Sequence, residues 1–212
     1  RTQRPYLQRY PLTQLDGLVL SHRDADHVGA AGPLRETFRP TEITAPKDLK
    51  LAAAGIPLVG TEVLLRPNAS FEVLYPPPAR AVGLADDQCL VVRFKIDDWK
   101  ILLMSDAGFT AEKWLLENQI DVSADLLIKG WHESDYSGLP EFINAVNPKF
   151  IGVHQVRTLA QRQAVHAWRA RMSAKGVPIW LQDETGAFEI SLTQQELSLH
   201  SYLPNQTLSW QR

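Results

Sequence analysis

The chain has 212 residues, of which 44% are hydrophobic and 22% are charged, which predicts one well-cored globular domain. The net charge of −2 argues against a chain that attracts nucleic acid over its whole surface, so any such binding needs a local patch. The single cysteine, Cys89, excludes an internal disulfide, and no apolar run has the length of a membrane span.

The first apolar run, residues 15–20, predicts a strand that ends in ligand-type side chains. These are His22, Asp24, Asp26 and His27. Extended backbone places His22 and Asp24 on one side, whereas the neighbours Asp26 and His27 diverge, and this favours two adjacent metal ions over one. Two imidazoles and two carboxylates suit zinc, manganese or iron better than calcium. The alternative is that an aspartate only caps the helix expected over residues 28–38.

Residues 21–29, with the pattern Ser-His-x-Asp-x-Asp-His-x-Gly, resemble the signature of the metallo-β-lactamase superfamily. Asp24 stands in place of the usual second histidine, and in this the run is similar to the C-terminal domain of ComEC-type DNA-uptake proteins. The resemblance implies an α/β fold, the αββα four-layer sandwich, without its two N-terminal β-hairpins. One sheet would then have an open edge and an exposed inner face. Because the chain starts at Arg1 rather than Met, we expect a fragment of a longer protein.

The middle of the chain is rich in β-forming residues. We expect strands over residues 41–45, 61–65, 71–75, 88–96 and 99–105, and a helix from Pro46 to Gly55. The last of these strands ends at Asp106, before a helix expected over residues 110–118. Alone, Asp106 would be a turn or capping residue. The resemblance aligns it with the family's aspartate that bridges two metals, with Ser105 in place of the family's glycine.

A third apolar strand, residues 124–129, leads into Trp131, His132, Glu133 and Ser134. This element is similar to the Lys-x-x-His-His-Gly-Ser run of ComEC-type domains. The resemblance implies that His132 is a metal ligand and that Trp131 and Ser134 contact substrate. Trp131 replaces the family's first histidine and Glu133 its glycine, which puts catalysis in question more than metal binding.

The remainder is expected to be scaffold. We predict helices over residues 139–146 and 159–175, a strand over 150–153, and a closing pair of strands over 178–182 and 187–191. We therefore predict a single domain over residues 1–192, and we expect residues 193–212 to form an irregular tail. His154 follows a strand and either reaches the rim of the site or is a plain strand-end residue. A basic row either faces phosphate backbone or is a solvated helix face: Arg157, Arg162, Arg169, Arg171 and Lys175.

The resemblance implies two divalent ions, zinc or manganese. It assigns His22 and Asp24 to one ion, and Asp26, His27 and His132 to the other, with Asp106 bridging them. Asp26 is also the expected catalytic residue, orienting the attacking water. The first ion lacks a third histidine, and Asp86 or Asp87 could substitute.

Such a site is suited to phosphodiester hydrolysis. By resemblance, the activity is degradation of the DNA strand that is not imported, and the partners are single-stranded DNA and the membrane-channel part of the same parent protein. The location implied is the extracytoplasmic face of a bacterial inner membrane, and no nucleotide cofactor is expected. Two alternatives stay open: a DNA-guiding module that has lost catalysis, with Trp131 as a stacking platform for a base, and a hydrolase of a small phosphoester or lactone.

Overall fold

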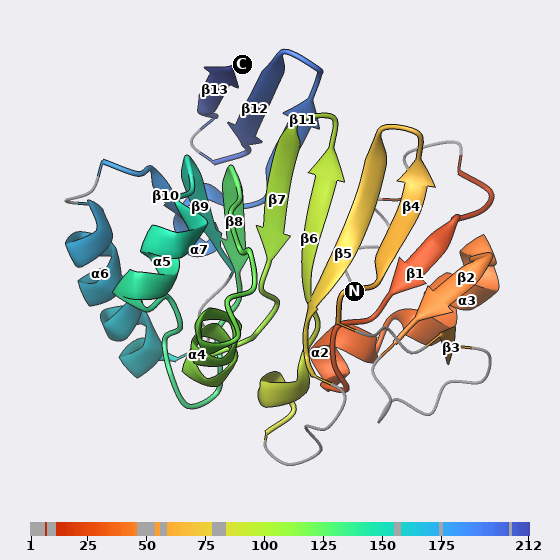
Figure 1. Cartoon of the computed structure of the whole chain (residues 1–212), viewed down its shortest axis with the longest axis horizontal. Helices are drawn as coiled ribbons and strands as arrows, with labels where there is room; N and C mark the ends of the chain where they lie inside the picture. The colour runs from red at the N-terminus through yellow and green to blue at the C-terminus, as the bar shows by residue number, and fades with distance from the viewer. Residues whose placement is uncertain are drawn as a thin grey trace.

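A seven-stranded sheet forms the centre of the molecule in the computed structural model (Figure 1). The described residues are Leu7 and residues 12–45, 54–55, 59–77, 84–154, 158–173, 176–203 and 205–212. In spatial order the strands are β10 (Ile179–Leu181), β9 (Phe150–Val153), β8 (Leu126–Lys129), β7 (Trp99–Leu103), β6 (Val91–Ile96), β5 (Ala69–Tyr75) and β4 (Glu62–Arg66).

The sheet is mixed. Strands β7 to β10 run parallel, whereas β4 to β7 are joined as antiparallel neighbours. The parallel strands read as continuous apolar runs because both of their faces are covered. Since parallel strands end at the same edge of a sheet, the segments that follow β7, β8 and β9 emerge side by side.

Helices cover one face of this sheet. They are α4 (Phe109–Glu117), α5 (Pro140–Val146) and α6 (Leu159–Ser173). Leu102 of the sheet packs in one buried cluster with Leu115, Phe142 and Trp168 of these helices. Each of these side chains is at most 1% exposed, so the helices are fixed firmly against the sheet.

A smaller parallel sheet lies on the other side, formed by β1 (Gly17–Val19), β2 (Glu42–Thr44) and β3 (Ala54–Gly55). The short helices α2 (Ala25–Val28) and α3 (Ala31–Phe38) follow β1. Ala31 packs with Leu20 and Ala45, so α3 covers the outer face of this sheet. The order helix, sheet, sheet, helix is the expected α/β four-layer arrangement. The helix predicted over 28–38 instead starts at Ala25 and is divided in two.

The C-terminal segment is ordered, and the prediction of an irregular tail over residues 193–212 is wrong. Strands β11 (Phe188–Leu192), β12 (Glu196–Ser201) and β13 (Thr207–Gln211) form a third, antiparallel sheet. Leu197 and Leu199 are fully buried against Trp99 and Phe150 of the central sheet. The expected pairing of residues 178–182 with 187–191 is also wrong, because β10 pairs with β9 and the short helix α7 (Gln182–Thr185) separates β10 from β11.

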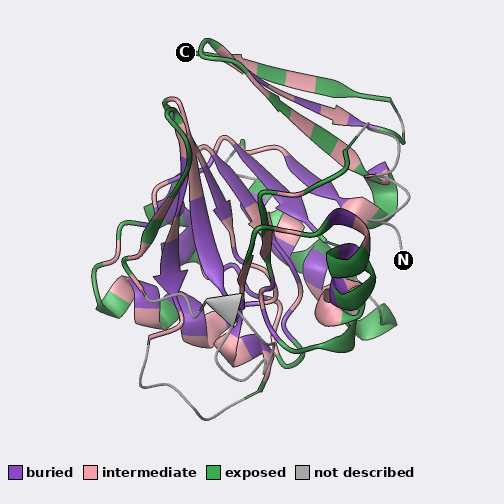
Figure 2. Cartoon of the chain, turned by 90° about the vertical axis from the view of Figure 1, so that its right-hand side faces the viewer, coloured by how far each residue is buried: buried purple, intermediate pink, exposed green. Residues whose placement is uncertain are grey.

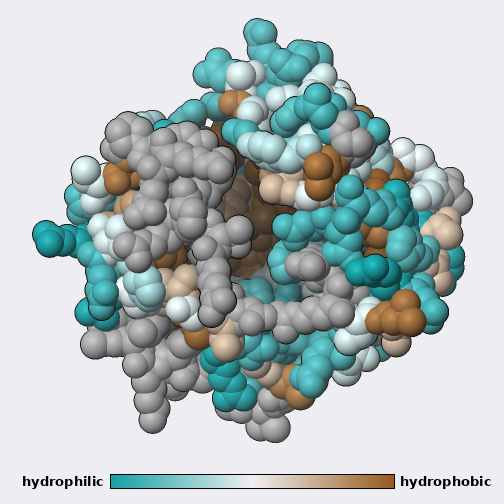
Figure 3. Space-filling model, turned by 180° about the vertical axis from the view of Figure 1, so that it is seen from behind, coloured by the Kyte–Doolittle hydropathy of each residue, from teal (hydrophilic) through white to brown (hydrophobic). Residues whose placement is uncertain are grey.

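An apolar hollow of about 630 Å³ lies between β1 and the central sheet and opens to the surface. Figure 2 shows the two smaller sheets on the same side of the buried central sheet, and Figure 3 shows an apolar hollow in that side of the surface. Its apolar lining consists of Val19, Leu90, Val92, Phe94, Leu103 and Ile128.

Most of the other predicted elements are present within a few residues of their expected bounds. The predicted helix from Pro46 to Gly55 lies mostly outside the described residues, and residues 54–55 are strand β3. Among the described residues, no helix combines the length and apolar character needed to cross a membrane.

Candidate metal centre

Four chain segments deliver ligand-type side chains to one edge of the central sheet. The segment after β1 carries His22 and Asp24, and α2 carries His27. Asp106 follows β7, and His132 follows β8. A short 3₁₀ helix, η1 (Asp86–Gln88), precedes β6 and supplies Asp86 and Asp87. The convergence follows from the parallel arrangement of β7 and β8, whose ends meet at this edge.

His22 is the centre of the first group. It is 1% exposed, and its Nε2 atom lies 3.8 Å from Asp24 Oδ2, 3.7 Å from Asp86 Oδ1 and 3.8 Å from Asp106 Oδ2. Burial is the largest influence on Asp86 and raises the pKa of its carboxyl group. Three carboxylates around one imidazole nitrogen make an environment that favours a cation.

His27 and Asp106 form the closest pair of the site. His27 Nε2 donates to Asp106 Oδ2 at 2.9 Å, and this bond is the main reason that the pKa of His27 is raised. Burial opposes ionisation of Asp106, but the His27 hydrogen bond and the charges of His27 and His22 outweigh it, so the pKa of Asp106 is lowered. The His22 and His27 ring centroids are 4.0 Å apart. Asp106 therefore touches both histidines of the first motif.

Ser21 orients these two rings. Its hydroxyl lies 3.1 Å from His22 Nδ1 and 3.3 Å from His27 Nδ1. Fixing Nδ1 leaves Nε2 of each ring turned to the carboxylates, which is the usual way that a second layer of contacts sets metal-binding histidines.

His132 forms a second group with Asp87. Its Nε2 atom is 3.4 Å from Asp87 Oδ1, and in the described part of the chain neither of these buried atoms makes a hydrogen bond. On the other side of the ring, Nδ1 lies 3.1 Å from both the backbone nitrogen and the hydroxyl of Ser134, and 3.6 Å from Asp135 Oδ2. Buried polar atoms are rarely left without a partner, so this pair is a natural position for a ligand.

The predicted residues are distributed as follows. The structure brings four of the predicted ligands together in two groups that share His22. One group is His22, His27 and Asp106, and the other is His22, Asp24 and Asp86. Within each group the candidate ligand atoms all lie within 4.8 Å of one another. The sequence interpretation put His27 with His132, whereas His27 lies beside His22 and Asp106. Asp26 belongs to α2, but its side chain is outside the described residues. Its catalytic and ligand roles stay predictions.

The two predicted substrate contacts differ in their surroundings. Trp131 is half-buried and lines the mouth of the site, and its indole Nε1 is buried without a hydrogen bond to the described residues. Ser134 is exposed, and its hydroxyl contacts His132 rather than open space. Both roles stay predictions.

Sequence reasoning left two residues undecided and missed a third. Asp86 and Asp87 were alternatives for one position, and both contribute: Asp86 faces His22 and Asp87 faces His132. Asp86 also accepts the backbone N–H of Glu133 at 2.7 Å, which ties η1 to the segment after β8. Asp135 was not singled out, because nothing in its spacing separates it from an ordinary loop aspartate.

The site opens through a pocket of about 330 Å³ whose lining is acidic. The lining residues are Asp24, Asp86, Asp106, Trp131, Glu133, His154 and Gln161. His154 is therefore at the rim, which was one of its two expected places. Two members of the basic row are paired with acids: Arg162 with Asp183 at 3.2 Å and Arg169 with Glu184 at 2.6 Å. Arg157 and Lys175 lie outside the described residues.

These residues fit divalent metal ions. Four aspartates, Asp24, Asp86, Asp87 and Asp106, gather around three histidines, and their ion pairs in the described part of the chain are with those histidines. Packing so many carboxylates into a half-buried site is unfavourable unless a cation balances them. Imidazole and carboxylate ligands suit zinc, manganese and iron.

Comparison with known proteins agrees with this geometry. Residues 1–135, more than half of the chain, match the family profile described as metallo-beta-lactamase superfamily. The ComE operon protein 3 of Bacillus subtilis (strain 168) is 28% identical over 159 residues. That match covers 68% of this chain but 20% of the relative, so the chain spans one fifth of the relative's length.

Two solved structures have a similar fold. A mutant of the CmlA beta-hydroxylase matches with a TM-score of 0.60 at 10% identity, over 97% of this chain and 46% of that one. The metallo-beta-lactamase fold protein YhfI from Bacillus subtilis matches with a TM-score of 0.53 at 14% identity, over 84% of this chain and 79% of that one. At such low identity these two matches concern the fold alone. The family profile establishes that the chain belongs to the metallo-β-lactamase superfamily, whose hydrolases typically bind divalent metals.

Proposed function

We propose that the chain is a metal-dependent hydrolase of phosphodiester bonds that acts on a DNA strand during DNA uptake. The observation that carries the proposal is the position of Asp106, which contacts both His22 and His27 at the point where the ligand groups meet. A carboxylate shared in this way is what a two-ion centre requires. The resemblance to ComEC-type DNA-uptake domains supports DNA as the substrate and a site of action outside the cytoplasmic membrane, and the similarity to ComE operon protein 3 agrees with that resemblance.

The two ligand groups suggest how ions would be held. His22, Asp24 and Asp86 would hold one ion. Asp106 would lie between the two positions with His27 beside it, and by the family resemblance His132 and Asp26 would hold the other ion. Asp87 stands beside His132 and adds a carboxylate to the second position. Two divalent ions in such a site make water a better nucleophile at neutral pH and stabilise the charge that develops on an attacked phosphate.

The chain's own residues would orient the reaction. Ser21 fixes the rings of His22 and His27, and Ser134 and Asp135 fix the ring of His132. Asp26 would hold a proton of the attacking water. Trp131 would provide an apolar wall at the mouth, against which a sugar or base can rest.

The acidic mouth of the site makes it possible to distinguish the hydrolase from the DNA-guiding module by the metal dependence of DNA binding. Asp24, Asp86 and Glu133 line the opening, and they repel a polyanion until cations neutralise them. A hydrolase should therefore bind DNA much more tightly with metal than after a chelator. The guiding module predicts DNA binding that survives the chelator, and its supporting observation is the half-buried indole of Trp131 at the mouth.

The test is hydrolysis of single-stranded DNA and of a generic phosphodiester with manganese or zinc. We expect activity in the wild-type chain, its loss after chelation and its loss in Asp26→Ala. The matched control is Asp98→Ala, which removes a carboxylate in the β6–β7 turn, away from the ligand groups. Absence of activity with every metal tried, together with DNA binding that persists in chelator and falls in Trp131→Ala, would replace the hydrolase with the guiding module.

A further inference from the structure

The segment that carries His132 is held by buried charges. This His132 loop, residues 130–139, connects β8 to α5 and includes Trp131, His132 and Asp135. A loop with a ligand needs a fixed conformation, because an ion tolerates only small displacements of its ligand atoms. Two of the side chains that fix this loop come from β8 and α4.

Glu112 of α4 holds the far end of the loop. It is 1% exposed, and its two carboxylate oxygens accept the backbone N–H groups of Gly138 at 2.5 Å and of Leu139 at 2.8 Å. Burial is the largest influence on this carboxyl group and raises its pKa. Two N–H groups that would otherwise be buried without a partner are satisfied by one side chain.

Lys129, the last residue of β8, holds the middle of the loop. It is 2% exposed, and its ammonium group donates to the carbonyl oxygen of Tyr136 at 2.8 Å. The same ammonium lies 4.8 Å from the ring centroid of Trp168, in a cation–π contact. Burial lowers the pKa of Lys129 to about 8, opposed by the charges of Glu112, Asp135 and Asp106.

The loop also fits closely against its neighbours. A side chain at Gly108 would meet the His132 ring at 2.6 Å, and one at Gly138 would meet the Trp168 indole at 2.7 Å. Trp168 Nε1 donates to the carbonyl oxygen of Gly138 at 2.8 Å. Asp135 accepts the N–H of Phe109 at 3.0 Å, which joins the loop to the start of α4. Glu112 and Lys129 therefore act on a loop that has little room to move.

We infer that Glu112 and Lys129 are positioning residues for His132: by binding the far end and the middle of its loop they set the direction of its Nε2 atom, and with it the affinity of the second metal position. This inference deepens the proposed function and rests on its two-ion centre. Neither residue lines the acidic mouth of the site. Buried charges are costly, so apolar residues would stabilise a purely structural loop at lower cost. The charges are explained if the loop must keep one particular conformation.

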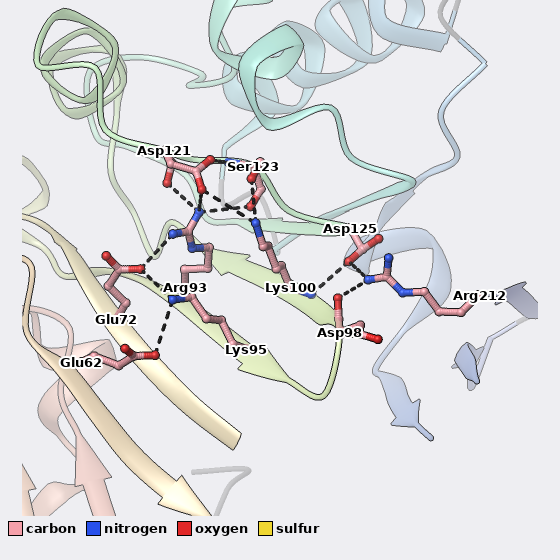
Figure 4. Close-up of polar contacts among 10 residues, drawn as sticks. All are labelled: Glu62, Glu72, Arg93, Lys95, Asp98, Lys100, Asp121, Ser123, Asp125 and Arg212. Carbon is pink, nitrogen blue, oxygen red and sulfur yellow. Dashed lines mark hydrogen bonds and ion pairs between the residues drawn. The ribbon is translucent and has the colours of Figure 1, made fainter. Parts of the chain in front are cut away.

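The test measures metal binding rather than activity. Glu112→Gln keeps the shape of the side chain but turns an amide NH₂ toward one of the two N–H groups, and Lys129→Met keeps the apolar stem without the charge. The wild-type chain and both variants are titrated with cobalt, using calorimetry for the number of ions and visible absorption for the ligand geometry. The matched control is Arg93→Met, which removes a buried charge at the opposite end of β8 (Figure 4).

We expect the wild-type chain to bind two ions. In Glu112→Gln and Lys129→Met the second ion should bind about 10- to 100-fold more weakly, with an altered cobalt spectrum, as is usual when residues behind a ligand are changed. The first ion should be nearly unaffected, and Arg93→Met should leave both affinities unchanged. Circular dichroism confirms that each variant is folded, and if Lys129→Met does not fold, Glu112→Gln decides the matter.

Each other outcome has a definite meaning. Wild-type affinity for both ions in the folded variants would overturn the inference, and so would an equal loss in Arg93→Met, because the effect would then be general destabilisation. A wild-type chain that binds one ion or none overturns the inference together with the two-ion centre. A chain that binds two ions with the expected losses but cleaves no phosphodiester supports the inference and contradicts the proposed function.

Discussion

Two clusters of charged side chains lie at opposite ends of β8 and balance their charges in different ways. Around Arg93, shown in Figure 4, acids and bases alternate. Arg93 is 4% exposed and donates to Asp121 and Glu72, each at 2.8 Å, while Lys95 and Lys100 pair with the same carboxylates. At the other end, the metal-centre aspartates have histidines as their partners.

The difference separates a structural cluster from a binding cluster. The Arg93 network carries its own counter-charges and joins β5 and β6 to the segment that leads into β8. Of the buried side-chain nitrogen and oxygen atoms of this network in the described residues, Arg93 Nε alone lacks a hydrogen bond. The metal centre leaves His132 Nε2 and Asp87 Oδ1 facing each other without a hydrogen bond. Bound metal ions would explain both the excess of carboxylates in the metal centre and the two buried atoms that make no hydrogen bond.

The largest expected effect on metal affinity comes from removing the carboxylate of Asp106, which the two histidines share. Asp106→Asn should lower metal affinity by more than about 100-fold, since residues behind a ligand already contribute 10- to 100-fold. Asparagine keeps the size of the side chain but loses the charge that His22 and His27 face. Calorimetric titration with manganese measures the effect. If Asp106→Asn binds two ions as tightly as the wild type, then Asp106 does not bridge the two positions.

Arg93→Met should have the largest effect on folding. Removing one partner of a buried charge cluster costs about 3 kcal/mol of unfolding free energy, at the low end of the usual range because Asp121 is 60% exposed. Urea unfolding measures it, and metal affinity at a temperature where the variant is folded should be unchanged. A parallel loss of metal affinity would show that metal binding responds to general destabilisation of the fold.

Asp86→Asn should separate stability from binding. The carboxylate is 5% exposed and lies near other aspartates, so neutralising it should raise the stability of the metal-free chain by roughly 1 kcal/mol. Asparagine still offers an oxygen to the N–H of Glu133. Metal affinity should fall in the same variant. Thermal unfolding with and without metal tests both signs, and a variant that is less stable without metal would mean that Asp86 is chiefly structural.

The sequence predicted the parts of this centre that depend on strand ends. Asp106 and His132 follow apolar strands, and parallel pairing brings such ends together whatever the detailed contacts are. It could not predict that His27 lies beside His22 instead of His132, because that depends on how α2 leaves β1. Nor could it choose between Asp86 and Asp87, since neighbouring residues in a short 3₁₀ helix point in different directions and both are used.

The sequence was weakest where packing between distant segments decides the structure. Residues 196–201 alternate between polar and apolar, with Leu197 and Leu199 buried, and this period-two pattern was the missed signal for β12. The pairing of β10 with β9 was missed because neighbours in sequence were assumed to pair. Glu112 carried no signal at all, because a glutamate in a helix is normally exposed and only the fold shows that α4 turns it toward the His132 loop.

The smallest expected effect concerns the pH dependence of the Arg93 network. Burial opposes ionisation of Asp121, but hydrogen bonds from Ser123 and Arg93 hold its pKa well below the ordinary range. A carboxyl group with a lowered pKa stabilises the fold above its unfolded pKa, about 3.9, and this contribution is lost as the pH falls through the folded value. The wild-type chain should therefore lose unfolding free energy below about pH 4 more steeply than Asp121→Asn. At neutral pH the variant should cost about 0.5 kcal/mol, since the carboxylate is largely exposed. Identical acid profiles for the two chains would mean that Glu72 and the backbone carbonyl oxygens of Asp121 and Ser123 are enough to hold Arg93, and that the charge balance there does not depend on the Asp121 carboxylate.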